Sequence, residues 1–184
     1  MTLLLGIESS CDETAASVVK NGRVVLSNIV ASQDALHIEY GGVVPEIASR
    51  AHIERILPII KEAIATADIT VEQLEGIVVG NRPGLIGSLL VGVAAAKTLA
   101  WSLQKPLIAV DHVIAHLWAP ILSGATVEYP ALGAVVSGGH TSLLILDDPA
   151  SVTCIGKTID DAAGEAFDKA AAILELGWPG GRRI

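Results

Sequence analysis

Two histidines four residues apart are the side chains of this chain best suited to metal chemistry. His112 and His116 stand in "VDHVIAHLWA", a segment that is otherwise apolar except for Asp111. On a helix this spacing puts two imidazoles on one face, where they can bind one metal ion. The same spacing also occurs between purely structural histidines. The Glu of the zinc-protease pattern His-Glu-x-x-His is absent, because Val113 stands there. Two ligands are fewer than the three of a usual catalytic site, so the pair predicts part of a site.

Two polar segments next to apolar runs are candidates for phosphate contacts. "ESSCDET" follows the apolar residues 3–7 and carries hydroxyls and carboxylates that could orient a phosphate or a cation. "SGGHT" (137–141) places two glycines between apolar runs, which allows a backbone to approach a ligand closely. Each segment taken alone is equally compatible with an ordinary loop or hairpin.

Composition limits the classes of protein to consider. The chain has 184 residues, of which 51% are hydrophobic, and this is ample for a buried core. A net charge of −8 argues against binding nucleic acid through charge alone, although a local basic patch is compatible with it. Two cysteines and the lack of a leader pattern predict a cytoplasmic protein. We expect no membrane span, because the uncharged segment Tyr129 to Leu146 is interrupted by "SGGHT".

The pattern of apolar residues predicts alternating strands and helices. Asn21-Gly22 between two β-branched runs predicts a type I′ hairpin. Helical spacing begins at Pro45, and Pro58 predicts a kink or two abutting helices. A buried strand "GIVVG", a helix from about Ser88 to Leu103 and the strand "PLIAV" lead to the histidines. After residues 123–130 come three more strands and the helix "DAAGEAFDKAAAILEL", which Asp160 or Asp161 could cap.

This order restarts halfway along the chain. Strand-strand-strand-helix-strand-helix-strand-helix is followed by a second strand-strand-strand-helix. Such a repeat resembles the actin, Hsp70 and sugar-kinase superfamily, in which two lobes bind a nucleotide through facing turns. We therefore expect a two-lobed α/β fold with a complete first lobe at residues 1–123 and a truncated second lobe at 124–184.

The motifs together resemble one family, the tRNA adenosine threonylcarbamoyltransferases, formerly called O-sialoglycoprotein endopeptidases. The resemblance spans nearly the whole chain in order, through "GIESSCDETAAS", "HIEYGGVVPEIASRAHIERI", "PGLIGSLLVG", "VDHVIAHLWA", "VSGGHTSLLIL" and "TIDDAAGEAFDKAAAILELGWPGG". It implies an acyltransferase that moves threonylcarbamoyl from threonylcarbamoyl-adenylate to N6 of the adenosine beside the anticodon, in tRNAs reading codons that begin with A.

The resemblance also implies site residues. His112 and His116 match the family's ligands for one divalent metal ion, iron or zinc, whose third ligand is an Asp with no counterpart before Ile184. The nucleotide, threonylcarbamoyl-adenylate or ATP, would bind at residues that match the family's contacts: Val135, Val136, Ser137, Gly138, Gly139, Asp168 and Gly181. Asp12 is a candidate for the group that takes the proton from the adenine amine.

Three departures from the family pattern stand out. Arg82 replaces a usual Gly, "VIAH" replaces a more typical Glu-Gly between the histidines, and "GGRRI" ends the chain little more than halfway along a family member. We therefore expect this chain to be inactive alone and to self-associate through its second lobe.

Other functions remain open at this stage. One alternative is the non-catalytic partner subunit of the same complex, which lacks the His-x-x-x-His motif. Another is a small-molecule kinase or ATPase of the superfamily, which would not explain the histidine pair. The expected partners are tRNA, the paralogous subunit and a small ATPase subunit.

Overall fold

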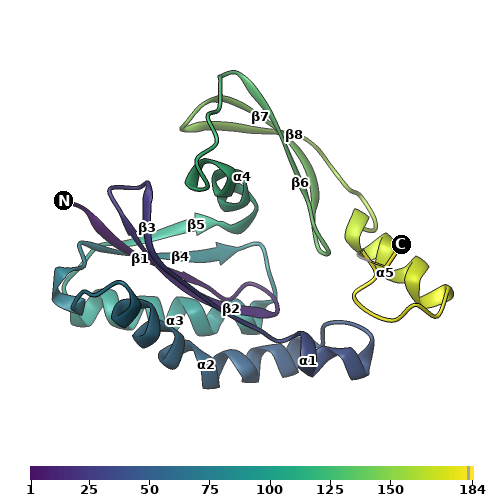
Figure 1. The fold of residues 1–184 in the computed structure, drawn as a ribbon, viewed down its shortest axis with the longest axis horizontal. Helices are drawn as coiled ribbons and strands as arrows, with labels where there is room; N and C mark the ends of the chain where they lie inside the picture. Colours follow the sequence, from purple (N-terminus) through teal and green to yellow (C-terminus); the bar gives the residue numbers. More distant parts are fainter. Residues whose placement is uncertain (182) are drawn as a thin grey trace. The chain divides into compact units, whose positions relative to one another are not determined.

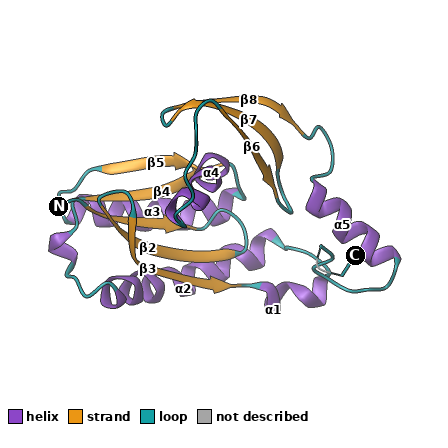
Figure 2. Ribbon diagram, turned by 45° about the horizontal axis from the view of Figure 1, so that its top comes forward, coloured by secondary structure: helices purple, strands orange, loops and turns teal. Residues whose placement is uncertain are grey.

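The protein forms two compact units. The computed structural model describes residues 1–181 and 183–184 (Figures 1 and 2). Unit 1 comprises Met1–His37 and Val43–His112, and unit 2 comprises Ile38–Gly42 and Val113–Ile184. The expected lobe boundary near Ser123 stays a prediction. In the described part of the chain, no helix combines the length and the apolar character that a membrane span needs.

Unit 1 contains a five-stranded sheet in the order β3-β2-β1-β4-β5. Its strands are β1 (Leu3–Glu8), β2 (Glu13–Lys20), β3 (Val24–Ser32), β4 (Gly76–Arg82) and β5 (Leu107–Asp111). The first three strands are antiparallel neighbours, whereas β1, β4 and β5 run parallel. A short helix α1 (Asp34–His37) follows β3, and the 3-10 turn η2 (Val71–Gln73) precedes β4.

The hairpin between β2 and β3 confirms the type I′ prediction. Asn21 and Gly22 have φ values of 52° and 68°, so both central residues adopt the left-handed conformation that this turn requires. The Asn21 side chain also accepts a hydrogen bond from the Thr2 backbone N–H at 2.8 Å, which ties the turn to the start of β1.

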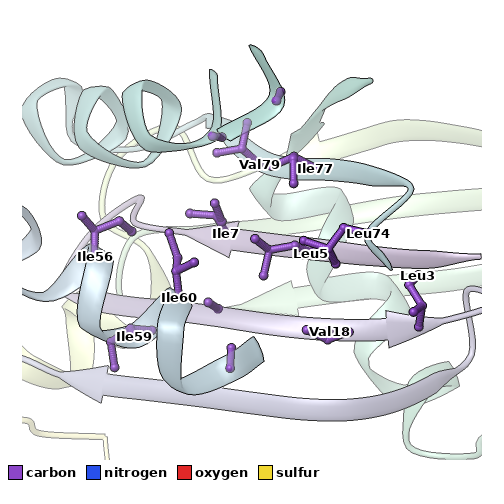
Figure 3. Close-up of a cluster of buried hydrophobic side chains, with 14 residues drawn as sticks. Leu3, Leu5, Ile7, Val18, Ile56, Ile59, Ile60, Leu74, Ile77 and Val79 are labelled. Atoms are coloured by element: carbon purple, nitrogen blue, oxygen red, sulfur yellow. The ribbon is translucent and has the colours of Figure 1, made fainter. Parts of the chain in front are cut away.

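Two crossover helices cover one face of this sheet. α2 (Pro45–Thr66) packs under β2 and β3, and α3 (Ile86–Ser102) packs under β1 and β4 (Figure 1). Leu3, Leu5 and Ile7 alternate along β1 and point toward α2 and α3. Figure 3 shows three isoleucines of α2 among the side chains of this core: Ile56, Ile59 and Ile60.

α2 runs through Pro58 as one helix of 22 residues, so the predicted alternative of two abutting helices is wrong. Proline removes one helical N–H donor and therefore leaves the carbonyl of Glu54 without that partner. Both Glu54 and Pro58 lie on the exposed side of the helix. Water can satisfy the carbonyl there, so the helix continues.

Unit 2 contains a three-stranded antiparallel sheet in the order β6-β7-β8. The strands are β6 (Ala131–Val136), β7 (Thr141–Asp148) and β8 (Ser151–Lys157). Helix α4 (His112–Leu122) precedes the sheet, α5 (Ala163–Ile173) follows it, and the 3-10 turn η1 (Ile38–Tyr40) belongs to this unit. The expected restart of the strand order is confirmed, and the two strand sets form separate sheets.

The N-terminus of α5 is capped by a residue of β7, so the prediction of Asp160 or Asp161 is wrong. Ala162 is the N-cap and makes no side-chain cap bond. The Ala163 N–H instead donates to the Thr141 hydroxyl at 2.8 Å. Asp161 pairs with Lys169 Nζ at 2.5 Å and is therefore engaged elsewhere.

Unit 1 also holds a buried polar cluster, formed by Thr14, Gln33, His37 and His52, all with 0% exposure. His52 Nε2 lies 3.0 Å from the Cys11 carbonyl, which only accepts hydrogen bonds, so Nε2 carries the proton. The Thr14 hydroxyl then donates to Nδ1 at 2.7 Å. His52 is thus fully satisfied as a neutral ring. Burial lowers the pKa of His52, and this outweighs the opposite effect of its bond to Cys11.

We expect His52 to make unit 1 less stable in acid. Below about pH 6.5, the ordinary pKa of an unfolded histidine, the unfolded chain takes up a proton that folded His52 does not. Stability should then fall by up to about 1.4 kcal/mol per pH unit until the folded-state pKa is reached.

His52→Gln keeps a donor and an acceptor but does not titrate. The excess stability of the wild type over this variant, measured by urea unfolding, should be smaller at about pH 5.5 than at about pH 8. A stability difference that is the same at both pH values would contradict this expectation, because all other titrating groups are common to the two proteins.

The sheet of unit 2 leaves apolar side chains exposed on one face. Leu132 and Val136 alternate along β6 and are 68% and 63% exposed. Leu143 pairs with Ala134, so it shares this face, and it is 45% exposed. Exposed apolar faces and open strand edges commonly lead to association.

We expect the 184-residue chain to self-associate through this face. Light scattering should show a mass above that of one chain, rising with concentration. Leu132→Thr together with Leu143→Thr should lower it toward the monomer, whereas Arg23→Ala in the exposed hairpin of unit 1 should not. A monodisperse wild-type monomer over the whole concentration range would contradict the expectation.

Candidate functional site

The carboxyl ends of three parallel strands form one edge of the unit 1 sheet. β1 ends at Glu8, β4 at Arg82 and β5 at Asp111, and α4 begins at His112 without an intervening residue. Ligands of open α/β sheets bind outside such carboxyl ends. Arg82 Nε lies 3.5 Å from Asp111 Oδ2, but its side chain is 76% exposed, so this ion pair adds little stability.

Glu8 and His112 form an ion pair at this edge. Glu8 Oε2 lies 3.1 Å from His112 Nδ1, and the Ser10 hydroxyl lies 3.2 Å from the same nitrogen. The other Glu8 oxygen, Oε1, accepts the Ser10 backbone N–H at 2.5 Å. Glu8 is therefore held by the loop on one side and by His112 on the other.

The two groups shift each other's pKa. Burial alone would raise the pKa of Glu8, but the hydrogen bond and charge of His112, with further hydrogen bonds from Ser10, hold it below its ordinary value. The hydrogen bond to Glu8 raises the pKa of His112, against the opposing effect of burial. An ionised carboxylate that faces a proton on His112 Nδ1 is thus the favoured state of the pair.

The loop after β1 is anchored residue by residue. The Ser9 hydroxyl donates to the Ser88 carbonyl at 2.8 Å and accepts from Gly92 N–H at 3.1 Å, and Ser9 is fully buried. The carbonyls of residues 10, 11 and 12 accept from Leu85 N–H, His52 Nε2–H and Gln33 N–H. The Ser9 hydroxyl is therefore used inside the fold.

Two further side chains of this loop, Cys11 and Glu13, have raised pKa values. Burial, followed by nearby Asp12, raises the pKa of Cys11 to about 12, so its thiol is not a thiolate at neutral pH. Burial and the charges of Asp12 and Asp34 raise the pKa of Glu13. Asp12 itself is half-buried at the end of the loop, where it stays the candidate proton acceptor.

His112 and His116 both lie in α4, four residues apart and hence on one face of that helix. Their expected orientation toward a cleft stays a prediction. In the described residues, no three His, Cys, Asp or Glu side chains are close enough to hold a metal ion together. His112 nonetheless has the features of a ligand, since metal-binding histidines commonly donate their second N–H to a carboxylate, as Nδ1–H does to Glu8.

The "SGGHT" turn of unit 2 is braced by α5. Ser137 N–H donates to the His140 carbonyl at 2.8 Å, and His140 N–H donates to the Ser137 hydroxyl at 3.0 Å. Gly138 and Gly139 are exposed, with open space where a side chain would stand. Gly164 N–H of α5 donates to the Ser137 carbonyl at 3.1 Å. The helix therefore holds the turn from behind and leaves its glycine backbone accessible.

Asp168 lies on the same side of α5 as Gly164, one helical turn further along. Its Oδ1 accepts from Gly180 N–H at 2.6 Å, and its Oδ2 accepts from Trp178 Nε1–H at 3.1 Å. The structure thus brings Asp168 and the segment before Gly181 together. Val135 is buried in the sheet, whereas Val136 is exposed at the end of β6.

The sequence reading missed several residues that position these groups. They are Glu8, His52, Thr141 and Gly164, and none belongs to the set of predicted site residues. The place of Glu8 could have been predicted from the sequence, because this residue directly follows an apolar run that was expected to form a buried strand. The rule that parallel strands share a carboxyl edge would have placed Glu8 near the residue that follows β5.

We expect Gly164→Ala to disturb the turn. An added Cβ would lie 2.7 Å from the Ser137 carbonyl oxygen and 2.8 Å from backbone atoms of Gly138, which cannot move as a flexible side chain can. Overpacking of this kind costs about 1–3 kcal/mol. Thermal unfolding and the amide NMR shifts of residues 137–140 should both change. The control is Gly156→Ala in β8, where the added Cβ meets no atom within 4 Å; equal effects of the two substitutions would contradict the prediction.

Comparison with known proteins identifies relatives along the whole chain. A family model described as tRNA N6-adenosine threonylcarbamoyltransferase matches residues 24–184. The relative of that name from Syntrophomonas wolfei is 54% identical over 183 residues, covering 100% of this chain and 54% of the relative. The relative from Symbiobacterium thermophilum is 56% identical over 182 residues, and the match covers 99% of this chain and 53% of that relative. The chain thus spans about half the length of these curated relatives.

Solved structures share the fold at low sequence identity. YeaZ from Pseudomonas aeruginosa aligns with a TM-score of 0.55 at 19% identity, covering 86% of this chain and 67% of that protein. The ethanolamine utilization protein EutJ from Carboxydothermus hydrogenoformans aligns with a TM-score of 0.55 at 13% identity. The match covers 97% of this chain and 59% of EutJ. These likenesses show a mixed α/β fold. The match of the family model and the identity to relatives show that the chain belongs to the tRNA N6-adenosine threonylcarbamoyltransferase family.

Proposed function

We propose that this protein transfers a threonylcarbamoyl group from threonylcarbamoyl-adenylate to N6 of the adenosine next to the anticodon of tRNAs that read A-starting codons. The observation that carries the proposal is identity above 50% over essentially the whole chain to relatives named for this activity. In this proposal the fold is two-lobed and actin-like, with the first lobe at residues 1–123 and part of the second at 124–184.

The nucleotide end of the substrate is assigned to unit 2. Gly138 and Gly139 offer accessible backbone to a phosphate or ribose, and Ser137 sets their position through its bonds to His140 and Gly164. Val135, Val136, Asp168 and Gly181 complete the proposed set. Because both Asp168 oxygens already accept a hydrogen bond, we assign Asp168 to holding the loop before Gly181 as well as to contacting the ligand.

We assign binding of the metal ion to His112 and His116. Imidazole nitrogens suit both iron and zinc, and His112 already has the carboxylate partner that such ligands use. A bound ion would act as a Lewis acid toward the carbamoyl carbonyl or the adenylate phosphate. His112 and His116 provide two ligands, so the proposal requires a third ligand from elsewhere.

Other residues of the chain are proposed to hold His112 in place and to accept a proton. Glu8 and Ser10 hold His112 in place, while Asp12 is proposed to accept the proton of the attacking adenine amine. The raised pKa of Cys11 favours the protonated thiol, which is a poor nucleophile. No covalent enzyme intermediate is needed, because the adenylate is itself an activated acyl donor: as the amine attacks the carbamoyl carbonyl, the bond to the phosphate oxygen breaks and AMP leaves.

Two other functions are less well supported. A non-catalytic partner subunit would share the fold but not need paired imidazoles on α4, and the pair is present at His112 and His116. A small-molecule kinase or ATPase would use the turns but leave the same pair unexplained. A non-catalytic paralogue and a small ATPase subunit are therefore proposed as partners, with tRNA as substrate in the cytoplasm. The net charge of −8 favours sharing the tRNA contact with them.

We expect transfer to depend on both histidines and on more than these 184 residues. The assay follows labelled threonine from threonylcarbamoyl-adenylate to tRNA in the presence of the partner subunits. The chain alone should give no product, because two imidazoles hold a metal weakly. The chain joined to the part of the Syntrophomonas wolfei relative that it does not match should give product.

In that joined protein, His112→Ala and His116→Ala should each lower transfer by at least about 100-fold, since loss of a ligand exceeds the effect of losing a ligand's partner. Arg23→Ala, in the exposed hairpin, is the matched surface control and should keep full activity. Transfer by the unextended chain would contradict the first expectation, and activity that survives both histidine substitutions would contradict the second.

A further inference from the structure

We propose that Thr141 is a positioning residue for the "SGGHT" turn: its hydroxyl fixes the first residue of α5, and α5 in turn sets the place of Ser137 and Gly138. The ligand part of this inference rests on the proposed function, which assigns the nucleotide to this turn. The contact between Thr141 and α5 does not depend on that function.

Thr141 is held in the middle strand of the unit 2 sheet. It is the first residue of β7 and pairs with Val136 of β6. Its carbonyl accepts the Thr158 N–H at 2.8 Å, directly after β8. Because β7 is bonded to a strand on each side, the backbone of Thr141 is fixed by both neighbours. Its side chain therefore reaches α5 from a fixed point.

The first turn of α5 takes hydrogen-bond acceptors from the β6–β7 hairpin. A helix leaves its first N–H groups without partners inside the helix. Ala163, the first residue of α5, donates its N–H to the Thr141 hydroxyl at 2.8 Å. The next residue, Gly164, donates its N–H to the Ser137 carbonyl at 3.1 Å. The two ends of the turn, residues 137 and 141, thus hold two consecutive donors of one helix.

Backbone contact makes the turn follow the helix. A Cβ added at Gly164 would lie 2.7 Å from the Ser137 carbonyl oxygen and 2.8 Å from the Cα and N atoms of Gly138. Helix and turn are therefore packed backbone against backbone, with no flexible side chain between them to absorb a movement. If the bond from Thr141 is lost, the start of α5 is free to shift, and Gly138 shifts with it.

The same helix carries another part of the proposed nucleotide site. Asp168, one helical turn beyond Gly164, accepts from Gly180 N–H at 2.6 Å and from Trp178 Nε1–H at 3.1 Å. A shift of α5 would therefore also move Asp168 and the segment before Gly181 relative to the sheet. One hydroxyl thus sets the geometry between the turn and the rest of the proposed nucleotide contacts.

The direct test compares two substitutions at position 141 in this chain. Thr141→Val keeps a β-branched side chain, which suits a strand, but removes the hydroxyl; Thr141→Ser keeps the hydroxyl. In Thr141→Val the Ala163 amide should exchange with solvent at least about fivefold faster, the effect of losing a typical helix cap. The amide NMR shifts of residues 137–139 should change as well, and Thr141→Ser should resemble the wild type. Unchanged exchange, or unchanged shifts at 137–139, would overturn the proposal.

The second readout is the dissociation constant for AMP, the nucleotide part of the proposed donor. It is measured by titration followed through the amide shifts of the folded protein, so a loss of stability alone does not alter it. In Thr141→Val the dissociation constant should rise at least about fivefold, because one cap bond no longer fixes the turn. Thr141→Ser should restore it.

Thr153→Val is the matched control. It makes the same chemical change at an exposed position of β8 in the same sheet and should alter the dissociation constant by less than about twofold. If it weakens AMP binding as much as Thr141→Val does, the contact with α5 is not the cause and the proposal fails.

The remaining outcomes separate a structural role from a positioning role. If Thr141→Val lowers the unfolding temperature but leaves the dissociation constant for AMP unchanged, the hydroxyl is only structural and the proposal fails. If the wild-type chain binds no AMP, the assignment of the nucleotide to this turn fails and the proposal fails with it. If AMP binding responds as expected while the joined protein does not modify tRNA, the proposed function fails and the positioning role stands.

Discussion

The arrangement of unit 1 depends on satisfying the backbone of the loop after β1. Three consecutive carbonyls, at residues 10, 11 and 12, receive donors from the start of α3, from His52 on α2 and from Gln33 before α1. A buried carbonyl without a donor would cost about 1–3 kcal/mol. Each of these elements is therefore drawn to the end of β1. The side chains of Glu8, Ser10 and Asp12 take their positions from that network.

Local chemistry was enough to predict much of the fold. Asn21-Gly22 needs no distant partner to form its turn, because both residues tolerate positive φ, and the hairpin is present. The repeated strand order and the helix that begins at Pro45 follow from the spacing of apolar residues, and both are observed. Within the candidate site, the placement of both histidines on one helix was predictable in the same way, because four-residue spacing is a local property.

Contacts between distant segments could not be predicted. Nothing near Ala163 indicates that its cap is the Thr141 hydroxyl, 22 residues earlier, and a nearby Asp was the reasonable local choice. Glu8 and His112 are 104 residues apart, and they meet across the intervening strand β4 because Gly80 has no side chain that would occupy the space of the Glu8 carboxylate. Pro58 is tolerated because its side of α2 faces water, which periodicity indicates only weakly.

Because β5 continues directly into α4, insertions or deletions at this junction would change the structure that follows. Asp111 ends the strand and His112 begins the helix, so no loop residue separates them. One inserted residue would turn every following side chain of α4 by about 100° around the helix axis, because 3.6 residues complete a turn. An insertion before His112 would turn both histidines together away from the end of β5, and one between positions 112 and 116 would move His116 off the face it shares with His112. Insertions and deletions should thus be absent from relatives between positions 107 and 116, and be tolerated in the segment at 123–130 that has no regular structure.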